Sequence, residues 1–511
     1  MKRRALISVY DKTGVVQFAK ALSERGWEIV SSSGTAKAIE EGEVEVVEVA
    51  DLTGVPHMLG GRVKTLHPAI SGGILARREL ESDMADVDTH RIPLIDMVVC
   101  TLYPFEETVR SGGGLDELIE KIDIGGVTLL RAAAKNYRHV TVISDIADYD
   151  SIVEELDKEG DISVSTRQSL ALKAFALTSG YDSAITAGLS SELGRDMEEQ
   201  EEIPSDLPLN LKLAQPLRYG ENPHQTAGLY LPSLSELPWE QLAGKPLSYN
   251  NILDLDGALR GMAMMQKDVG AVVLKHTTPC GMAVADTVGD AYDRAFECDS
   301  LSAYGGVVGV TRTVDLDSAK RIGEHFTEIV AAPDFDEKAV EYLTKRRPSL
   351  RLIKWNGGRV MPWQITGTWS GLLAQKDQLP PLPSPDSGEW IGPKRLDLWE
   401  DMLLAWKAAC LSKSNAVAMV KDGAAVGIGM GFCSRVFAVE FAASQAGDKA
   451  KGAVMASDAF FPFADGLEKA AEAGIVAIIQ PGGSVRDDEV KSRAEELGIS
   501  MFLSGWRTFR H

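Results

Sequence analysis

The fold is decided by a short apolar stretch near the start of the chain, Ala5-Leu6-Ile7-Ser8-Val9, which leads into a polar loop. A short continuous apolar run is typical of a strand that is buried on both faces of a parallel sheet. The residues after the loop predict a helix, which Gly26 is placed to end. Apolar side chains recur there at helical spacing: Val15, Phe18, Ala19 and Leu22.

Strands and helices alternate through the first third of the chain. Further strands are predicted at Trp27–Val30, Met97–Cys100 and Val140–Ser144, with helical patterns between them. Alternation of this kind predicts an α/β fold in which a parallel sheet is covered by helices on both faces.

The length of 511 residues suggests about three domains. Residues 195–208 are acidic, contain proline and hold few apolar side chains. We therefore expect a first domain at 1–195, a linker at 196–210 and a larger region at 211–511. A weaker break, rich in Pro and Ser, lies near 379–393 and predicts two subdomains within that larger region.

Composition narrows the classes of function. The chain carries 53 basic and 74 acidic side chains, a net charge of −21, which argues against nucleic acid as the main partner but not against a small anionic substrate. No stretch approaches the roughly 20 apolar residues of a membrane span, and the first apolar run is too short for a signal peptide. Five widely spaced cysteines without a C-x-x-C motif suit the reducing cytoplasm and give no zinc knuckle.

Three loops that each follow a predicted strand are rich in small or hydroxyl residues: Ser8–Gly14, Ser31–Thr35 and Asp123–Thr128. Loops at the carboxyl ends of parallel strands are where such sheets bind ligands. Small residues let backbone N–H groups approach a phosphate, and a following helix N-terminus favours the anion. For any one of these loops, a plain strand-to-helix turn is an equally good interpretation.

Positive charge is concentrated in the segment Gly60–Pro68, which contains Arg62, Lys64 and Thr65 beside two glycines. Such a concentration is unusual in an acidic protein and indicates an anion site, whereas the alternative is a solvated surface turn. Taken alone, Tyr103 would be a half-buried aromatic residue and Lys135 a lysine on a helix surface.

The second part of the chain places a Lys-His pair at the end of a predicted strand. Val272–Leu274 leads into Lys275 and His276, and Pro279 is expected to stop the strand and so expose both side chains at a sheet edge. Histidine acts as a general base near neutral pH, and an adjacent cation stabilises an oxyanion. A single histidine is more often a structural residue, and this alternative stays open on spacing alone.

Other segments of the second part combine polar and aromatic residues. Leu217–Gln225 gathers Arg, Tyr, Asn and His in one loop, and Ser412–Asn415 is a short polar run. Ser457–Asp465 joins aromatic faces with two carboxylates, which suits a flat heterocycle held by stacking and by hydrogen bonds to its N–H edge. An aromatic cluster is more often part of the core than a binding slot.

Taken in order from Ser8 to His511, these motifs resemble the family of bifunctional enzymes with phosphoribosylaminoimidazolecarboxamide (AICAR) formyltransferase and inosine monophosphate (IMP) cyclohydrolase activities. The resemblance implies a methylglyoxal-synthase-like N-terminal domain and a transformylase region of two cytidine-deaminase-like subdomains. It implies formyl transfer from 10-formyltetrahydrofolate, as co-substrate, to the 5-amine of AICAR. The product, formyl-AICAR (FAICAR), then closes to IMP with loss of water. It also implies a homodimer with transferase sites between subunits, and catalysis that requires no metal.

The resemblance assigns roles in formyl transfer. His276 would be the base or proton shuttle, Lys275 would stabilise charge and help to protonate the folate leaving nitrogen, and Asn415 would polarise the formyl oxygen. Contacts to the nucleotide are implied at Arg218, Tyr219, Gly305, Glu328 and Arg507. Contacts to the folate are implied at Arg435, Val436, Phe460, Pro462, Phe463 and Asp465.

The resemblance also assigns roles in ring closure. Catalysis or oxyanion stabilisation would fall to Lys64, Tyr103, Asp123 and Lys135. Thr101 stands where the family mostly has Asn, and its shorter side chain is expected to weaken a contact to the nucleotide. The residues expected to hold the phosphate, ribose and base are Lys12, Thr13, Ser33, Gly34, Thr35, Arg62, Thr65, Cys100, Thr101, Gly125 and Gly126.

Three alternatives to this interpretation remain open on the sequence. A zinc deaminase shares the implied fold but needs H-x-E and P-C-x-x-C, and here Pro279-Cys280 lacks the second cysteine. A non-catalytic nucleotide-binding module would keep the phosphate loops but would need neither the Lys275-His276 pair nor Lys135. In the third alternative, one of the two activities has been lost.

Overall fold

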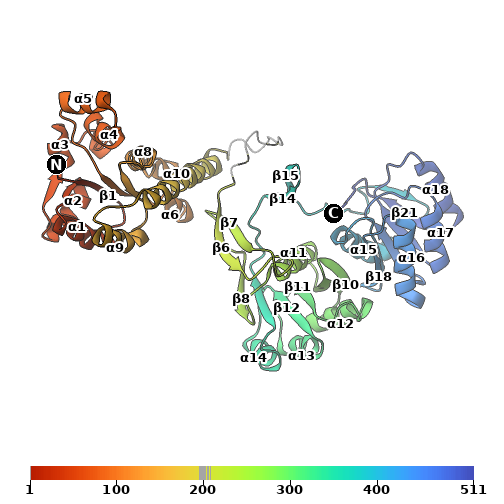
Figure 1. Cartoon of the computed structure of the whole chain (residues 1–511). Coiled ribbons are helices and arrows are strands. Elements are labelled where there is room, and N and C mark those ends of the chain that lie inside the picture. Colours follow the sequence, from red (N-terminus) through yellow and green to blue (C-terminus); the bar gives the residue numbers. More distant parts are fainter. Residues whose placement is uncertain (1, 195–202, 204–206, 208) are drawn as a thin grey trace. The chain divides into compact units, whose positions relative to one another are not determined.

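The computed structural model describes residues 2–194, 203, 207 and 209–511, and most of the predicted linker 196–210 lies outside them. The chain forms two compact units, which we describe separately (Figure 1). Unit 1 comprises Met1–Lys212 with Pro232–Leu234, and unit 2 comprises Leu213–Leu231 with Ser235–His511. No helix among the described residues is both long and apolar enough to cross a membrane.

Unit 1 is built on a five-stranded, all-parallel sheet in the order β3-β2-β1-β4-β5. The strands are β1 (Arg4–Val9), β2 (Glu28–Ser31), β3 (Val46–Glu48), β4 (Met97–Thr101) and β5 (Thr141–Ile143). The helices are α1 (Val15–Glu24), α2 (Ser33–Glu41), α3 (Val49–Thr53), α4 (Pro68–Leu75), α5 (Glu81–Thr89), α6 (Phe105–Arg110), α7 (Leu115–Glu120), α8 (Gly125–Lys135), α9 (Tyr149–Glu159) and α10 (Val164–Leu193).

The parallel α/β prediction for this unit is confirmed. Strand β1 lies between β2 and β4 in the sheet. Its apolar run is buried on both faces, because Leu6 and Ile7 point to opposite faces and neither has exposed surface. Helix α1 buries the four apolar residues that were expected at helical spacing. Ile7 pairs with Ser31, and Val9 pairs with Thr101, so the carboxyl ends of β1, β2 and β4 lie at one edge of the sheet.

Unit 2 contains a twelve-stranded sheet in the order β16-β21-β20-β19-β17-β18-β10-β9-β11-β12-β13-β8. Its strands are β8 (Trp239–Ala243), β9 (Gly270–Lys275), β10 (Thr278–Val284), β11 (Gly306–Val310), β12 (Thr327–Ala332), β13 (Arg351–Trp355), β16 (Glu389–Ile391), β17 (Val417–Lys421), β18 (Ala424–Gly429), β19 (Val454–Ser457), β20 (Ala477–Gln480) and β21 (Ser500–Leu503). Two separate ribbons pair β6 (Leu211–Leu217) with β7 (Ala227–Pro232), and β14 (Trp363–Thr368) with β15 (Gly371–Lys376).

The eight helices that we describe for unit 2 cover both faces of this sheet. Helices α11 (Tyr249–Met264) and α15 (Trp399–Leu411) share one apolar core that includes Met262 and Trp406. The other face has a separate core in each half. The helices over it are α12 (Val288–Cys298), α13 (Leu316–Glu324) and α14 (Glu337–Arg346) in the first half, and α16 (Arg435–Ala446), α17 (Asp465–Ala473) and α18 (Asp487–Glu496) in the second.

The two halves of unit 2 repeat one arrangement: a helix, an antiparallel hairpin, and then three helix–strand pairs. Across the sheet, the strand order is β10-β9-β11-β12-β13 in the first half and β18-β17-β19-β20-β21 in the second. The parallel and antiparallel pairings are the same in both halves. The halves join where β10 pairs with β18 through Ala283 and Ala424.

Candidate active sites

The first candidate site lies where the loops of unit 1 meet at the carboxyl edge of the sheet. The Thr35 hydroxyl donates to the Val9 carbonyl at 3.0 Å and joins the second loop to the first. The Lys12 ammonium lies over Gly34, 4.0 Å from the point where a Cβ would stand. Ser33, at the start of α2, has a φ of 53°, a conformation that L residues rarely adopt. A cation, a hydroxyl and a helix N-terminus therefore converge, as an anion site requires.

Thr101, which was expected to contact the nucleotide, is engaged within the protein. Its hydroxyl oxygen accepts hydrogen bonds from the backbone N–H groups of Tyr10 at 2.8 Å and Asp11 at 3.2 Å. The Thr101 side chain therefore holds the loop that carries Lys12. The neighbouring Cys100 is almost fully buried and pairs with Ser8 in the sheet, so the predicted contact of Cys100 with the nucleotide gains no support from its exposure.

The loop before α8 holds a carboxylate in a tight turn. Asp123 accepts the Gly126 N–H at 2.7 Å, and a Cβ on Gly126 would stand 2.5 Å from the same carboxylate, so only glycine fits. The Asp123 N–H donates to the Tyr181 hydroxyl at 2.9 Å. Burial raises the pKa of Asp123, and burial together with the Asp123 charge raises the pKa of Tyr103. A carboxylate and a phenol with raised pKa values are typical of an acid–base site.

Other predicted residues of unit 1 lie around this loop. The Thr65 hydroxyl is 3.2 Å from the Cβ position of Gly125, and the Lys64 ammonium is 3.4 Å from that of Gly61. Arg62 is exposed and forms an ion pair with Glu120. Lys135 lies in the last turn of α8, about 15 Å along the helix from Gly125 at 1.5 Å per residue. The described contacts therefore do not bring Lys135 to the start of this helix.

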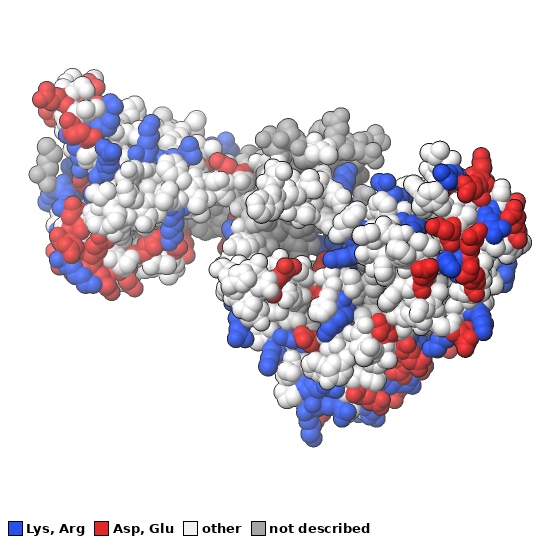
Figure 2. Space-filling model, turned by 45° about the vertical axis from the view of Figure 1, so that its right-hand side comes forward, with Lys and Arg blue, Asp and Glu red and all other residues white. Residues whose placement is uncertain are grey.

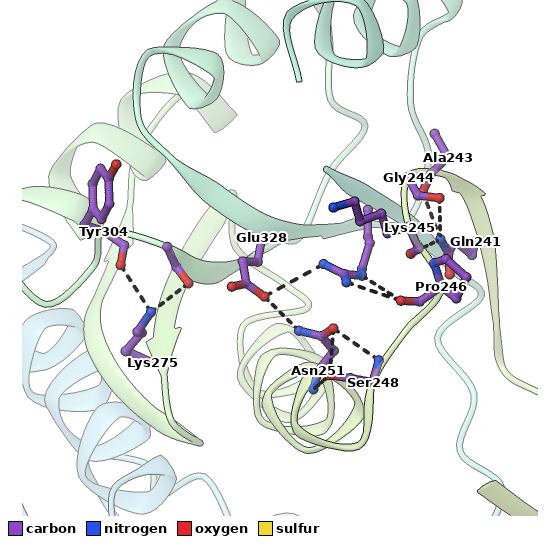
Figure 3. A network of polar contacts seen from close by, with 12 residues as sticks. Gln241, Ala243, Gly244, Lys245, Pro246, Ser248, Asn251, Lys275, Tyr304 and Glu328 are labelled. Atoms are coloured by element: carbon purple, nitrogen blue, oxygen red, sulfur yellow. Dashed lines mark hydrogen bonds and ion pairs between the residues drawn. The ribbon is translucent and has the colours of Figure 1, made fainter. Parts of the chain in front are cut away.

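The second candidate site begins at Lys275, the last residue of β9. Its ammonium donates to the carbonyl oxygens of Tyr304 at 3.2 Å and Gly305 at 2.9 Å (Figure 3). Gly305 has a φ of 71°, which glycine adopts without strain. Two of the three ammonium protons are used in this way, and one remains for a ligand.

His276 and Thr277 form a two-residue turn between β9 and β10, with φ values of 52° and 63°. The Thr277 N–H donates to Asp254 at 2.6 Å, and the charges of His276 and Lys275 also act on this carboxylate. Burial raises the pKa of Asp254 despite these favourable neighbours. The expectation that Pro279 stops the strand is wrong: Pro279 lies inside β10 opposite Leu274, and the turn itself ends β9.

Glu328 at the start of β12 is tied to helix α11. It accepts a hydrogen bond from the Asn251 amide at 2.9 Å (Figure 3). Asn251 also closes the capping box of α11 with Ser248. Asn251 and Asp254 are three residues apart and share one face of the helix. Sequence reasoning missed both, because a polar pair at this spacing ordinarily marks a solvated face.

In the second half, Asn415 is held by Arg435, the first residue of α16. The Asn415 side-chain oxygen accepts from Arg435 at 2.7 Å, and its amide donates to the carbonyls of Phe432 at 2.9 Å and Cys433 at 3.2 Å. The same guanidinium forms a buried ion pair with Asp458. Every polar atom of the Asn415 side chain therefore has a partner within the protein.

The aromatic segment after β19 divides between the core and the surface. Phe461 is buried, whereas Phe460 is half-buried and Phe463 is exposed. The Arg486 guanidinium lies 4.6 Å from the centre of the Phe463 ring. Pro462 and Asp465 are exposed beside it, and Val436 is half-buried near the start of α16. The segment thus offers aromatic faces and a carboxylate to a ligand, while one phenylalanine serves the core.

Strand directions place both halves of the second site at one edge of the sheet. Strand β9 ends at the edge where β11, β12 and β17 begin, because β9 is antiparallel to β10, β10 to β18 and β18 to β17. The single pairing of β10 with β18, at Ala283, lies at the opposite edge. We call Asp254, Lys275, His276 and Glu328 the Lys275 cluster, and Asn415, Arg435 and Asp458 the Asn415 cluster. No hydrogen bond or ion pair within the described part of the chain joins the two clusters.

Two guanidinium groups that were predicted to contact the nucleotide, those of Arg218 and Arg507, are exposed and lie outside these clusters. The Arg218 guanidinium stacks on the Tyr219 ring at 5.5 Å, and that of Arg507 stacks on Phe509 at 4.7 Å. Figure 2 shows basic and acidic side chains interspersed over the face in view, rather than one broad basic surface. The cations at the sites are therefore local features of an acidic protein.

The donor set does not favour zinc. Cys280 is buried in β10, and burial raises the pKa of its thiol to about 12, which disfavours the thiolate that zinc binds. Among residues 2–194, 203, 207 and 209–511, no group of three or more His, Cys, Asp or Glu side chains is placed to hold a metal ion.

Comparison with known proteins identifies the family. Residues 133–445 match the model of the AICARFT/IMPCHase bienzyme, and residues 14–128 match that of the MGS-like domain. The chain is 44% identical over 534 residues to the bifunctional purine biosynthesis protein PurH of Persephonella marina. It is 45% and 43% identical to the PurH proteins of Clostridium botulinum and Halalkalibacterium halodurans, and each of these matches covers the whole of both chains. The chain belongs to the AICARFT/IMPCHase bienzyme family.

Proposed function

We propose that unit 2 transfers a formyl group to AICAR and that unit 1 closes the product to IMP, each with the residues described above. The chain is a bifunctional enzyme of purine biosynthesis, with formyltransferase and IMP cyclohydrolase activities. The observation that carries this conclusion is identity of 43–45% along the whole length of bifunctional relatives.

In formyl transfer, the 5-amine of AICAR attacks the formyl carbon of 10-formyltetrahydrofolate. A carbon–nitrogen bond forms, the bond to the folate N10 breaks, and the amine proton passes through His276 to N10. Lys275 has one free ammonium proton with which to stabilise the developing charge. Asn415 polarises the formyl oxygen after it releases its longer bond, to Cys433.

We assign nucleotide contacts around this centre to Gly305 and Glu328, to the exposed Arg218 and Arg507, and to the half-buried Tyr219. The folate would lie against Phe460, Pro462, Phe463 and Asp465, beside Arg435 and Val436. The exposed Phe463 ring and the half-buried Phe460 ring, close in sequence to the exposed Asp465 carboxylate, support this placement, because a pterin stacks well and presents an N–H edge.

In ring closure, the carboxamide nitrogen of FAICAR attacks its formyl carbon and water leaves. Asp123 takes the amide proton, and its raised pKa makes it a stronger base than an ordinary carboxylate. Tyr103 and Lys64 stabilise the oxyanion. The phosphate and ribose lie against Lys12, Thr13, Ser33, Gly34, Thr35, Arg62, Thr65, Gly125 and Gly126. Lys135 would act from the far end of α8, and neither reaction as written needs a metal.

We further propose a homodimer. The Lys275 and Asn415 clusters occupy one sheet edge but are not joined within one chain, so a partner that supplies the second cluster would complete the site. Cytoplasmic location is supported by the free state of all five cysteines.

Separate assays of formyl transfer and of ring closure in two variants test the assignment of one reaction to each unit. His276→Ala should abolish formyl transfer and leave ring closure of supplied FAICAR unchanged, whereas Lys64→Ala should have the reverse effect. A loss of both activities in either folded variant, or of neither, would contradict the assignment.

A further inference from the structure

The internal repeat of unit 2 places Lys275 and Lys421 at equivalent positions. Each is the last residue of the first hairpin strand and precedes a two-residue turn. Each ammonium donates to the loop before the third strand: Lys275 to Gly305 at 2.9 Å, and Lys421 to Lys451 at 2.7 Å. A feature that both halves share therefore belongs to the repeated fold, whereas a feature of the first half alone needs another explanation.

Both turns are held by an aspartate from the preceding helix. In the first half, Asp254 on α11 accepts the Thr277 N–H at 2.6 Å. In the second, Asp401 on α15 accepts the N–H groups of Asp422 at 2.8 Å and Gly423 at 2.7 Å. The aspartate-to-turn contact is thus common to both halves.

The turns differ in how well their residues suit the backbone. All four turn residues have positive φ, with 52° and 78° at Asp422 and Gly423 against 52° and 63° at His276 and Thr277. Asp-Gly is among the preferred pairs for such a turn, whereas a β-branched residue in the left-handed region is a strained outlier. The first half thus keeps the turn with a β-branched residue, Thr277, where the second half has glycine, and strain of this kind gathers at functional sites.

We propose that Asp254 is a positioning residue for formyl transfer, which holds the strained His276–Thr277 turn through the Thr277 N–H and so keeps His276 beside Lys275. This inference rests on the proposed role of His276. The carboxylate also carries charge close to both side chains, as the effect of His276 and Lys275 on its pKa shows. Histidine enters the left-handed region more readily than most residues, whereas threonine is disfavoured there, so the hydrogen bond from the Thr277 N–H to Asp254 supports a conformation that Thr277 itself resists.

The test uses the full chain with Asp254→Ala. We expect kcat of formyl transfer to fall by roughly 10- to 100-fold, because small misplacement of a catalytic group costs about this much. KM for AICAR should stay within about threefold, since transition-state rather than ground-state binding is lost. Ring closure of FAICAR should be unchanged. The matched control is Asp401→Ala, which removes the same kind of contact from an Asp-Gly turn and should leave kcat of formyl transfer unaffected.

A second substitution separates positioning from a loss of folding. Thr277→Gly introduced into Asp254→Ala should recover most of the lost kcat, because glycine adopts positive φ freely. Unchanged kcat in Asp254→Ala, an equal loss in Asp401→Ala, or no recovery with Thr277→Gly would overturn the proposal. Full formyl transfer by His276→Ala would instead overturn the proposed role of His276 on which it rests.

Discussion

The Arg435 guanidinium donates a 2.7 Å hydrogen bond to the Asn415 side-chain oxygen and also forms an ion pair with Asp458. Asp458 has no exposed surface, and the Arg435 side chain is almost fully buried. The bond fixes which end of the Asn415 amide faces Arg435. One buried cation therefore orients a proposed catalytic amide and neutralises a buried carboxylate.

Arg435→Met should leave Asp458 buried without its partner. Removing one member of a buried pair lowers the free energy of unfolding by about 3–5 kcal/mol, which denaturant unfolding of unit 2 would measure. Formyl transfer should fall with it, and ring closure should persist. Arg493→Met is the control, because its ion pairs with Glu468 and Glu496 are partly exposed and should contribute about 1 kcal/mol or less. Equal losses in the two variants would contradict the role given to Arg435.

Thr101→Val should impair ring closure alone. The substitution removes the oxygen that accepts from Tyr10 and Asp11, and two hydrogen bonds at about 0.5–1.5 kcal/mol each correspond to a loss of kcat/KM of roughly 5- to 150-fold. Thr101→Ser keeps the hydroxyl and should stay near wild type. If the valine variant closes FAICAR at the wild-type rate, the hydroxyl does not support the Lys12 loop in the way that we describe.

Asp123→Asn should lower ring closure by at least about 100-fold and yet stabilise unit 1 at neutral pH. The folded pKa of Asp123 is raised above 3.8, so its ionisation destabilises the fold as pH rises through 3.8 and then through the folded pKa. The Tm of the variant relative to wild type should therefore be higher at pH 7 than at pH 4.

Asp83→Asn is a control, because the pKa of Asp83 is lowered in the folded state whereas that of Asp123 is raised. Hydrogen bonds from Arg77 lower the pKa of Asp83 to about 2, so its stabilising effect is present above pH 3.8 and is lost as pH falls towards 2. A Tm difference for Asp123→Asn that is constant or decreases between pH 4 and pH 7 would contradict the pKa direction.

Mixing of two inactive variants tests the proposed dimer. If His276 from one chain and Asn415 from the other form one site, a dimer of His276→Ala with Asn415→Ala has one intact site. Random pairing should then restore about a quarter of wild-type formyl transfer. No recovery after subunit exchange would show that both residues act within one chain.

The parallel sheet of unit 1 could be predicted because each signal is local. A buried strand needs an apolar run such as Ala5–Val9, and α1 needs apolar residues at helical spacing. The meeting of the loops Ser8–Gly14 and Ser31–Thr35 followed from the same logic, because parallel strands bring their carboxyl ends to one edge. The expectation that Asp123–Thr128 also follows a strand is wrong, because this loop comes after helix α7. Confirmation of the family by full-length relatives shows how specific the ordered motifs are.

What the sequence missed depends on contacts between distant residues. Asp254 meets Thr277 across 23 positions, and its side chain on α11 gives no sign of this by itself. Pro279 was expected to end β9 because proline lacks an N–H, but a strained turn ends the strand first. The family resemblance implied two similar subdomains in unit 2, but the residues themselves gave no sign of the repeat, because its two turns share a backbone conformation and not a sequence.

The most direct test of the central claim supplies the purified protein with AICAR and 10-formyltetrahydrofolate and follows FAICAR and IMP together over time. The account predicts transient FAICAR followed by IMP, well above the rate without enzyme. Folded protein that yields neither product, or that accumulates FAICAR without IMP, would contradict the claim that one chain carries both activities.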